Sequence, residues 1–246
     1  MVAEVYDIAH PLSETVGDVD FYIRAADGIR GRILEPACGT GRILIPLLEA
    51  GHAADGVDHS PDMLEICRAH CQKRDLVPTL HATDISTFIV PETYEAVIMP
   101  RGSIRNVEGR DATLRTLECF RDSLVPGGRL LLDVTIPLFI EGTLPIIEHW
   151  ARDQYVYTCE TLIVEYDPFL NRTVRYARYA KWDDGELVTT ELHRFCFQHW
   201  NLDEFRNLLT TAGFTDITVT GNFRDEAPRA DTRYWNFSAR KPAPAM

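Results

Sequence analysis

The chain has 246 residues, of which 45% are hydrophobic and 25% charged, and these fractions are typical of a globular protein rather than a collagen-like or disordered one. Its 37 acidic residues outnumber the 25 basic ones, which gives a formal net charge of −12. This charge disfavours a nucleic-acid partner, because affinity for a phosphate backbone depends on Lys and Arg. We therefore expect a small-molecule ligand and a single domain over residues 1–246, since one core can still grow at this length.

The sequence predicts neither export nor a membrane span. The first 22 residues contain five acidic side chains where a secretory signal needs a basic start, and no window reaches the roughly 18 apolar residues of a membrane helix. The six cysteines are dispersed, which favours reduced thiols and a cytoplasmic location. Cys67 and Cys71 form the only close pair, four residues apart on a predicted helix, and we interpret them as thiols that pack the helix, so we expect no metal.

Strands and helices alternate between residues 32 and 136. Short apolar runs predict strands at Ile33–Leu34 and over 53–60, 78–86, 94–100 and 128–136, and helical spacing of apolar residues predicts helices over 42–52, 61–74 and 111–124. Ser60 and Pro61 form the start signal of the second of these helices. The alternation predicts an α/β fold with a doubly wound, Rossmann-like and mostly parallel sheet.

The pattern changes after Pro137. Extended aromatic and β-branched runs between residues 146 and 197, separated by turn signals, predict an inserted lobe of antiparallel strands that we assign to the substrate. A helix follows over 201–214, with Asn201 at its start and Gly213 at its end, and two closing strands follow over 216–222 and 233–241.

The loop after the first strand, Glu35-Pro36-Ala37-Cys38-Gly39-Thr40-Gly41-Arg42, lies where ligands bind in an open parallel sheet. Its two glycines allow a ligand to approach the backbone closely. A dinucleotide fingerprint would require Gly or Ala at position 44, which is Leu44, and no Gly-Lys-Ser/Thr sequence for phosphate is present. The loop therefore predicts a cofactor other than NAD or a nucleoside triphosphate.

The sequence EPACGTG resembles motif I of the class I S-adenosyl-L-methionine-dependent methyltransferases, whose form is [DE]-x-x-x-G-x-G. Asp58 at the end of the second strand matches the residue that binds both ribose hydroxyls in that family, and Asp84-Ile85 matches its adenine contact. The YEAVIM sequence of residues 94–99 and the LVPGG turn of residues 124–128 are similar to two further family motifs, so the resemblance covers residues 32–136. It implies S-adenosyl-L-methionine as cofactor, bound by Glu35, Ala37, Gly39, Gly41, Asp58, His59, Met63, Asp84, Ile85 and Met99.

The cofactor carries an activated methyl group, so the protein needs a general base only where the acceptor arrives protonated. No catalytic triad is visible, and among four candidate histidines we favour His199, where the inserted strands meet the last helix. Arg101, Arg105 and Trp150 are the candidate substrate residues, and the two arginines would suit an anionic group. The alternative for Arg101 is a surface arginine paired with Glu108 or Asp111.

We therefore expect methyl transfer to an N, O or C nucleophile of a small molecule. The inserted strands followed by FRNLLTTAGF, residues 205–214, resemble the branch that methylates amino sugars, glycine-type amines and natural products. The alternative is a non-catalytic cofactor-binding or sensor protein, and a tRNA or protein methyltransferase is disfavoured because the sequence after the fourth strand, MPRGS, lacks the Asn-Pro-Pro-Tyr type motif. The sequence leaves a homodimer open.

Overall fold

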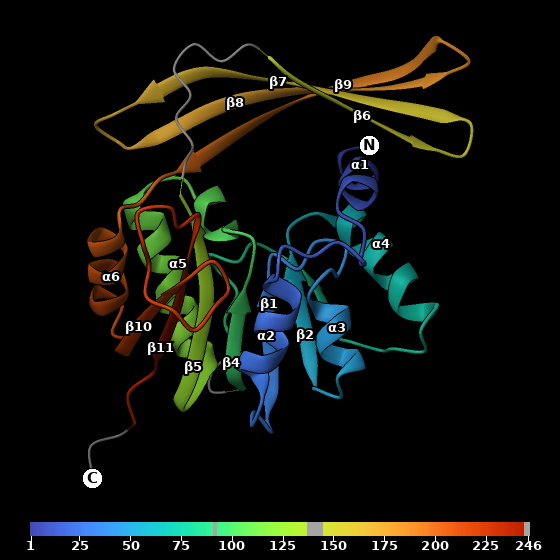
Figure 1. Ribbon diagram of the computed structural model, residues 1–246. Helices are drawn as coiled ribbons and strands as arrows, with labels where there is room; N and C mark the ends of the chain where they lie inside the picture. The colour runs from blue at the N-terminus through green and yellow to red at the C-terminus, as the bar shows by residue number, and fades with distance from the viewer. Residues whose placement is uncertain (91–92, 137–144, 244–246) are drawn as a thin grey trace.

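The computed structural model describes residues 1–90, 93–136 and 145–243, and its centre is a seven-stranded sheet (Figure 1). The strand order is β10-β11-β5-β4-β1-β2-β3. β1 to β5 run parallel, whereas β11 runs antiparallel to both β5 and β10. These strands are β1 (Arg32–Pro36), β2 (Ala54–Asp58), β3 (Leu80–Ala82), β4 (Tyr94–Met99), β5 (Leu124–Thr135), β10 (Thr215–Gly221) and β11 (Tyr234–Arg240).

Two hydrophobic clusters fill the two faces of this sheet. Successive residues of the central strands point to opposite faces, so Leu34 and Val97 belong to one cluster while Ile33 and Ile98 belong to the other. Burial on both faces explains why these strands are nearly continuous apolar runs. The helices are α1 (Val2–Ala9), α2 (Asp18–Ala26), α3 (Leu44–Glu49), α4 (Pro61–Gln72), α5 (Arg110–Ser123) and α6 (Leu202–Thr211), with a 3-10 turn η1 (Ser103–Asn106).

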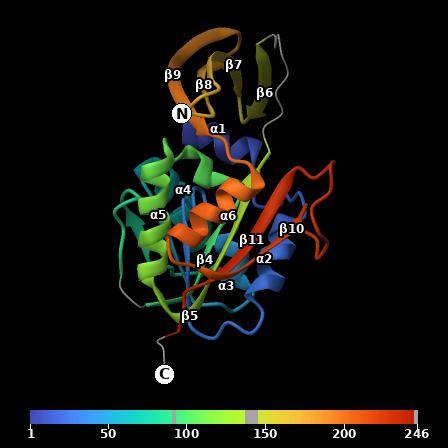
Figure 2. The ribbon, with the colours of Figure 1, turned by 90° about the vertical axis from the view of Figure 1, so that its left-hand side faces the viewer.

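A second sheet of four antiparallel strands lies across one end of the core (Figure 1). It comprises β6 (Ile146–Arg152), β7 (Tyr155–Asp167), β8 (Arg172–Asp183) and β9 (Glu186–Gln198). The sheet follows β5 in the chain and precedes α6, so it covers the ends of the parallel strands at which the predicted cofactor motifs lie; Figure 2 shows it above α6 and β11. The predicted fold class, a mostly parallel α/β sheet with an inserted antiparallel lobe, is confirmed.

Two helices near the N-terminus, α1 and α2, were not predicted. α1 buries Ala3, Val5 and Asp7, and it lies between α4 and the four-stranded sheet (Figure 1). α2 buries Tyr22 and Ala26 in the core beside β1. Each has fewer than ten residues, and helices of this length are stabilised by packing rather than by their own sequence pattern.

Candidate active site

The loop after β1 is held in shape by the carboxylate of Asp58 at the end of β2. One carboxylate oxygen accepts the backbone N–H of Gly39 at 2.9 Å, and the other accepts the N–H of Ser60, also at 2.9 Å. The Cys38 N–H donates to the Val57 carbonyl at 3.0 Å. Each carboxylate oxygen keeps a second lone pair, so Asp58 orders the loop and can still accept hydrogen bonds from a ligand.

The two glycines of this loop have different roles. Both have positive φ, +54° at Gly39 and +93° at Gly41. A Cβ at Gly41 would lie 2.9 Å from the Cys67 sulfur and from Ile45, so glycine is required there for packing. A Cβ at Gly39 would meet only the Tyr6 ring, at 3.8 Å. The backbone at Gly39 is therefore open on the side where a cofactor could approach.

Glu35, the acidic residue of the loop, is 2% exposed at the end of β1. It accepts a hydrogen bond from the Leu44 N–H, but its Oε2 atom is buried with no hydrogen-bond partner among the described residues. Burial raises the pKa of this carboxyl well above its usual value, although Arg42 opposes the shift. A buried acceptor without a donor fits the methionyl ammonium of S-adenosyl-L-methionine.

The other predicted cofactor residues lie at the ends of neighbouring strands. Ala37, in the loop itself, has a φ of 56°. The His59 side chain is 87% exposed, 3.7 Å from Asp58, and Met63 lies in the first turn of α4. Asp84 is exposed and accepts the Ser86 N–H at 2.7 Å, a bond that lowers its pKa. Ile85 packs on the core and Met99 is fully buried. The strands β4, β1, β2 and β3 are neighbours in the sheet, so these residues lie along the carboxyl ends of four adjacent parallel strands.

The predicted substrate arginines lie together beyond the end of β4. Arg101 and Arg105 line a pocket of about 260 Å³, whose other lining residues are Gly102, Asn106, Thr135, Phe197 and Tyr234. Arg101 does not pair with Glu108, which instead binds Arg172 and Arg194 at 2.8 and 3.4 Å. Nor is an ion pair with Asp111 present among the described residues, so the surface alternative for Arg101 is not supported.

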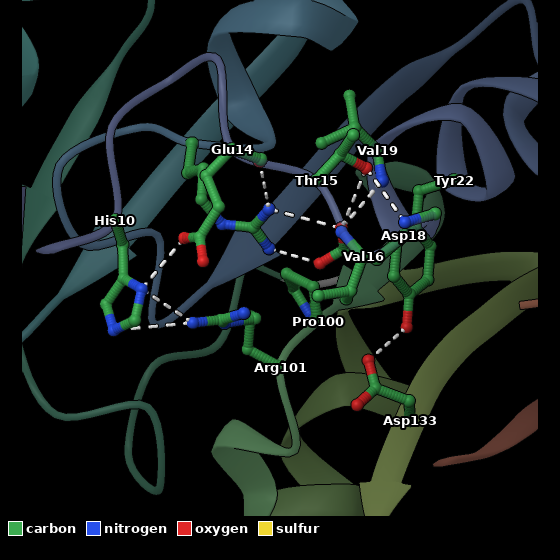
Figure 3. Close-up of polar contacts among 12 residues, drawn as sticks. His10, Glu14, Thr15, Val16, Asp18, Val19, Tyr22, Pro100, Arg101 and Asp133 are labelled. Carbon is green, nitrogen blue, oxygen red and sulfur yellow. Dashed lines mark hydrogen bonds and ion pairs between the residues drawn. The ribbon is translucent and has the colours of Figure 1, made fainter. Parts of the chain in front are cut away.

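A polar network from the N-terminal segment joins this pocket to the cofactor loop (Figure 3). Arg101 donates to His10 at 2.9 Å, and His10 contacts Glu14 at 2.8 Å. Arg42, directly after the second glycine, donates to the Glu14 carbonyl and forms a buried ion pair with Asp18. Sequence reasoning missed this network, because its acidic members precede the first recognisable motif.

Tyr6 is a further residue that the motifs did not indicate. α1 places its ring against the open side of Gly39, and burial raises the pKa of its hydroxyl. α1 is in turn attached to the four-stranded sheet, since Glu4 accepts hydrogen bonds from Tyr157 and Lys181. The N-terminal helix α1 therefore covers the cofactor loop and also contacts the inserted sheet.

The structure places His199 and Trp150 away from the lining of the arginine pocket. His199 is 2% exposed and shares a hydrogen bond of 2.5 Å with the Thr173 hydroxyl. Burial, together with Arg105 and Arg175, lowers the pKa of His199 to about 4. Trp150 lies on β6 opposite Tyr157, on the sheet face that contacts α1.

The described residues include no helix that is long and apolar enough to cross a membrane. Within the same part of the chain, no three His, Cys, Asp or Glu side chains are grouped as metal ligands. The six cysteines are free thiols.

Comparison with known proteins agrees with this geometry. Residues 33–128 match the family described as "Methyltransferase domain". The glycine/sarcosine N-methyltransferase of Aphanothece halophytica is 26% identical over 212 residues, which are 85% of this chain and 76% of that protein. An S-adenosylmethionine-dependent methyltransferase from Clostridium acetobutylicum has the same fold, with a TM-score of 0.76, 16% identity and 98% of both chains covered.

DesVI of Streptomyces venezuelae also shares the fold, with a TM-score of 0.75 at 20% identity, and the match covers 100% of this chain and 99% of that one. The ordered motifs, the sheet that brings them to one end of its parallel strands and the family match over residues 33–128 together show that this part of the chain is a methyltransferase domain of the class I, S-adenosyl-L-methionine-dependent kind.

Proposed function

We propose that this enzyme methylates an amine nitrogen of a small molecule that also carries an anionic group. The observation that carries the proposal is the adjacency of two sites: the cofactor loop at the end of β1 and the pocket of Arg101 and Arg105 at the end of the next strand, β4. The glycine/sarcosine N-methyltransferase relative and a sugar N,N-dimethyltransferase of Streptomyces fradiae, 27% identical over 137 residues, support nitrogen as the acceptor atom.

The residues at the cofactor edge suit the parts of S-adenosyl-L-methionine. The cofactor supplies a methyl group on a sulfonium, which an in-line nucleophile can attack. The Asp58 carboxylate would hold the ribose hydroxyls, and the orphan oxygen of Glu35 would accept from the methionyl ammonium. Asp84 and Ile85 would contact the adenine, and the ring of Tyr6 would cover the cofactor loop from α1.

The protein's part in catalysis is then to orient a neutral amine toward the methyl group. Positioning alone can supply several kcal/mol of barrier reduction. His199 is our proposed proton acceptor, although burial and the charges of Arg105 and Arg175 lower its pKa to about 4 and make it a weak base in the free protein. Trp150 would contact the methyl acceptor from the inserted sheet.

The free cysteines support a cytoplasmic location.

Turnover of labelled S-adenosyl-L-methionine with a panel of small amines, phenols and carboxylates, followed by mass analysis, tests this function. We expect methylated amines, with faster turnover of amines that carry a carboxylate or phosphate. A chain that binds S-adenosyl-homocysteine but methylates no member of the panel would favour the non-catalytic alternative.

Cofactor binding is tested separately with Asp58→Asn. Loss of a charged hydrogen-bond partner costs about 1.5–3 kcal/mol, so S-adenosyl-homocysteine should bind at least about tenfold more weakly in calorimetry. Asp62→Asn, an exposed position in the next helix, is the control and should bind within about twofold of the wild type. Unchanged affinity in folded Asp58→Asn would remove this carboxylate from the cofactor site.

A further inference from the structure

Arg175, on β8 of the inserted sheet, has a guanidinium for which the described residues provide no hydrogen-bond acceptor and no ion pair. Its side chain is half-buried, its Nε atom is buried without a partner, and burial lowers its pKa. A guanidinium carries five N–H donors, and leaving such a group buried and unpaired is costly. An anionic acceptor from outside the described residues would compensate this group.

Arg105 has a second guanidinium with few hydrogen-bond partners, and it contacts the same aromatic ring as Arg175. The central carbons of the Arg105 and Arg175 guanidinium groups each lie 5.1 Å from the centre of the Phe197 ring. Arg105 donates to the Thr135 carbonyl at 3.2 Å, but its Nε is also buried without a partner. Burial and the nearby charge of Arg175 lower the pKa of Arg105 to about 10. Contact with one aromatic ring offsets only part of this cost.

The surrounding groups do not neutralise the two arginines. The charge of the Asp133 carboxyl acts on Arg105. However, Asp133 accepts hydrogen bonds from the Tyr22 hydroxyl at 2.7 Å and from the backbone N–H groups of Arg101 and Gly102, and it forms no ion pair with a described arginine. Burial raises its pKa to about 6. The charges of Arg105 and Arg175 disfavour protonation of His199, whose imidazole is neutral near pH 7.

Three other arginines near this cluster or buried in the core are paired with carboxylates. Arg172, on the same strand as Arg175, binds Glu108 at 2.8 Å and Glu165 at 3.2 Å, and the buried Arg42 binds Asp18. Arg178, three residues after Arg175 on β8 and on the outer face, pairs with Glu160. Arg105 and Arg175 differ from these three arginines in having no carboxylate partner among the described residues, and both contact Phe197, whose ring lines the pocket of Arg101 and Arg105.

We propose that Arg175 joins Arg105 and Arg101 in an oxyanion subsite that binds a carboxylate or phosphate group of the methyl acceptor between the inserted sheet and the core. This inference rests on the proposed function, and it makes Arg175 a residue that determines substrate specificity. The planar forks of the guanidinium groups suit the oxygens of either group. Since Arg105 comes from η1 and Arg175 from β8, the bound anion would connect the inserted sheet to the core.

The subsite is tested first without any turnover. Inorganic phosphate and acetate are titrated into the protein with S-adenosyl-homocysteine present, by calorimetry and by thermal melting, with chloride at matched ionic strength as reference. We expect at least one of the two anions to bind and to raise the melting temperature of the wild type. Arg175→Met should weaken that binding at least tenfold, and Arg175→Lys should restore only part of it, because lysine lacks the fork.

Arg178→Met is the matched control, since it removes an arginine of the same strand that lies on the outer face; it should bind the anions within twofold of the wild type. Tighter binding of phosphate than of acetate would indicate a phosphate-bearing acceptor, and the reverse order a carboxylate-bearing one. Equal binding by the wild type and Arg175→Met, or no binding of either anion by the wild type, would overturn the subsite.

A kinetic measurement separates this inference from the proposed function. With an anionic amine that is turned over, Arg175→Met should raise KM at least tenfold and change kcat less than threefold, as expected for lost substrate binding. Anion binding that depends on Arg175 in a protein without methyl transfer would refute the proposed function and keep the subsite. Turnover with an unchanged KM would refute the subsite alone.

Discussion

Glu35, near the end of β1, and Asp58, at the end of β2, are buried carboxyl groups next to the same loop. Their hydrogen bonds differ, so one stabilises the folded protein and the other does not. Both oxygens of Asp58 accept backbone N–H groups, so its charge contributes to the folded loop. Glu35 has one orphan oxygen, and burial raises its pKa well above 4.5. Under the proposed function, this incompletely compensated carboxyl would serve a cationic ligand rather than stability.

Glu35→Gln should therefore stabilise the free protein and weaken cofactor binding. Between the unfolded pKa near 4.5 and the raised folded value, the folded state holds a proton that the unfolded state has lost, so the free energy of unfolding falls as pH rises through this range. Glutamine cannot titrate and should remove this part of the pH dependence. Urea unfolding between pH 4.5 and 8 measures it, and calorimetry should show at least tenfold weaker binding of S-adenosyl-homocysteine.

Glu65→Gln, at an exposed position of α4, serves as the control and should change neither quantity. A Glu35→Gln variant that is less stable than the wild type at neutral pH would show that the carboxylate has a structural role instead.

The buried surroundings of His199 lead to a testable prediction about the pH dependence of kcat. Its pKa of about 4 predicts a kcat–pH profile without an inflection near 6.5 that is due to this imidazole. If it accepts the proton, His199→Gln should lower kcat about 100-fold. Thr173→Val, which removes the hydrogen bond to His199 and keeps the ring, should cost far less. A kcat within twofold of the wild type in folded His199→Gln would leave positioning as the whole of the protein's contribution.

At the scale of elements, α1 connects two functions that the sequence assigns to separate segments. Tyr6 faces Gly39 of the cofactor loop, while Asp7 accepts from Arg152 of the inserted sheet at 2.9 Å and contacts His70 of α4 at 2.6 Å. A movement of the inserted sheet would therefore be transmitted to the helix that covers the cofactor loop.

Tyr6→Ala should weaken the binding of S-adenosyl-homocysteine at least fivefold and increase its dissociation rate, because the ring no longer covers the loop. Tyr6→Phe keeps the ring and is the matched control, with an affinity expected within threefold of the wild type. Stopped-flow displacement measures both rates. Equal dissociation rates in the alanine variant and the wild type would show that α1 does not cover bound cofactor.

The elements that the sequence predicted well are those whose burial leaves a local pattern. β1, β4 and β5 are buried on both faces and appear as apolar runs. Ser60 is the N-cap residue of α4, and its hydroxyl accepts the Met63 N–H at 3.3 Å. β5 begins earlier than predicted, at Leu124, because Gly127 and Gly128 exchange hydrogen bonds with Lys241 just beyond β11. Such a pairing between residues more than a hundred positions apart has no local signal.

Some residues of the candidate site could be predicted from the sequence and others could not. The cofactor residues follow strand ends that carry recognisable motifs, and the sheet order brings them together. Tyr6, Arg42 and Arg175 were missed, because their positions depend on packing between the N-terminal segment, the loop and the inserted sheet. Arg175 was one of several basic residues on a mixed strand, and only its lack of a carboxylate in three dimensions distinguishes it from Arg172 and Arg178.

At the scale of the whole molecule, the two faces of the inserted sheet differ. The inner face contacts α1 and η1, whereas the outer face exposes Ile147, Leu162 and Leu192, with exposed fractions of 69%, 43% and 65%. The Glu160–Arg178 ion pair lies among them, since Glu160 is opposite Ile147 and Arg178 is opposite Leu192. A two-fold axis through this face would place each apolar group against another and each charge of the pair near its opposite in the second copy.

We therefore expect a homodimer through the outer face. Sedimentation velocity should give a species of twice the 27.9 kDa chain mass, and joint substitution of Leu162→Glu and Leu192→Glu should give monomers, because like charges would meet across the axis. Val77→Glu, at a 96% exposed position far from this sheet in the chain, should remain dimeric. A monomeric wild type at concentrations of about 50 μM would contradict the interface. Since the cofactor edge lies beneath the inner face, the monomeric variant should keep its affinity for S-adenosyl-homocysteine, and a loss of that affinity would instead show that the two faces of the sheet are coupled.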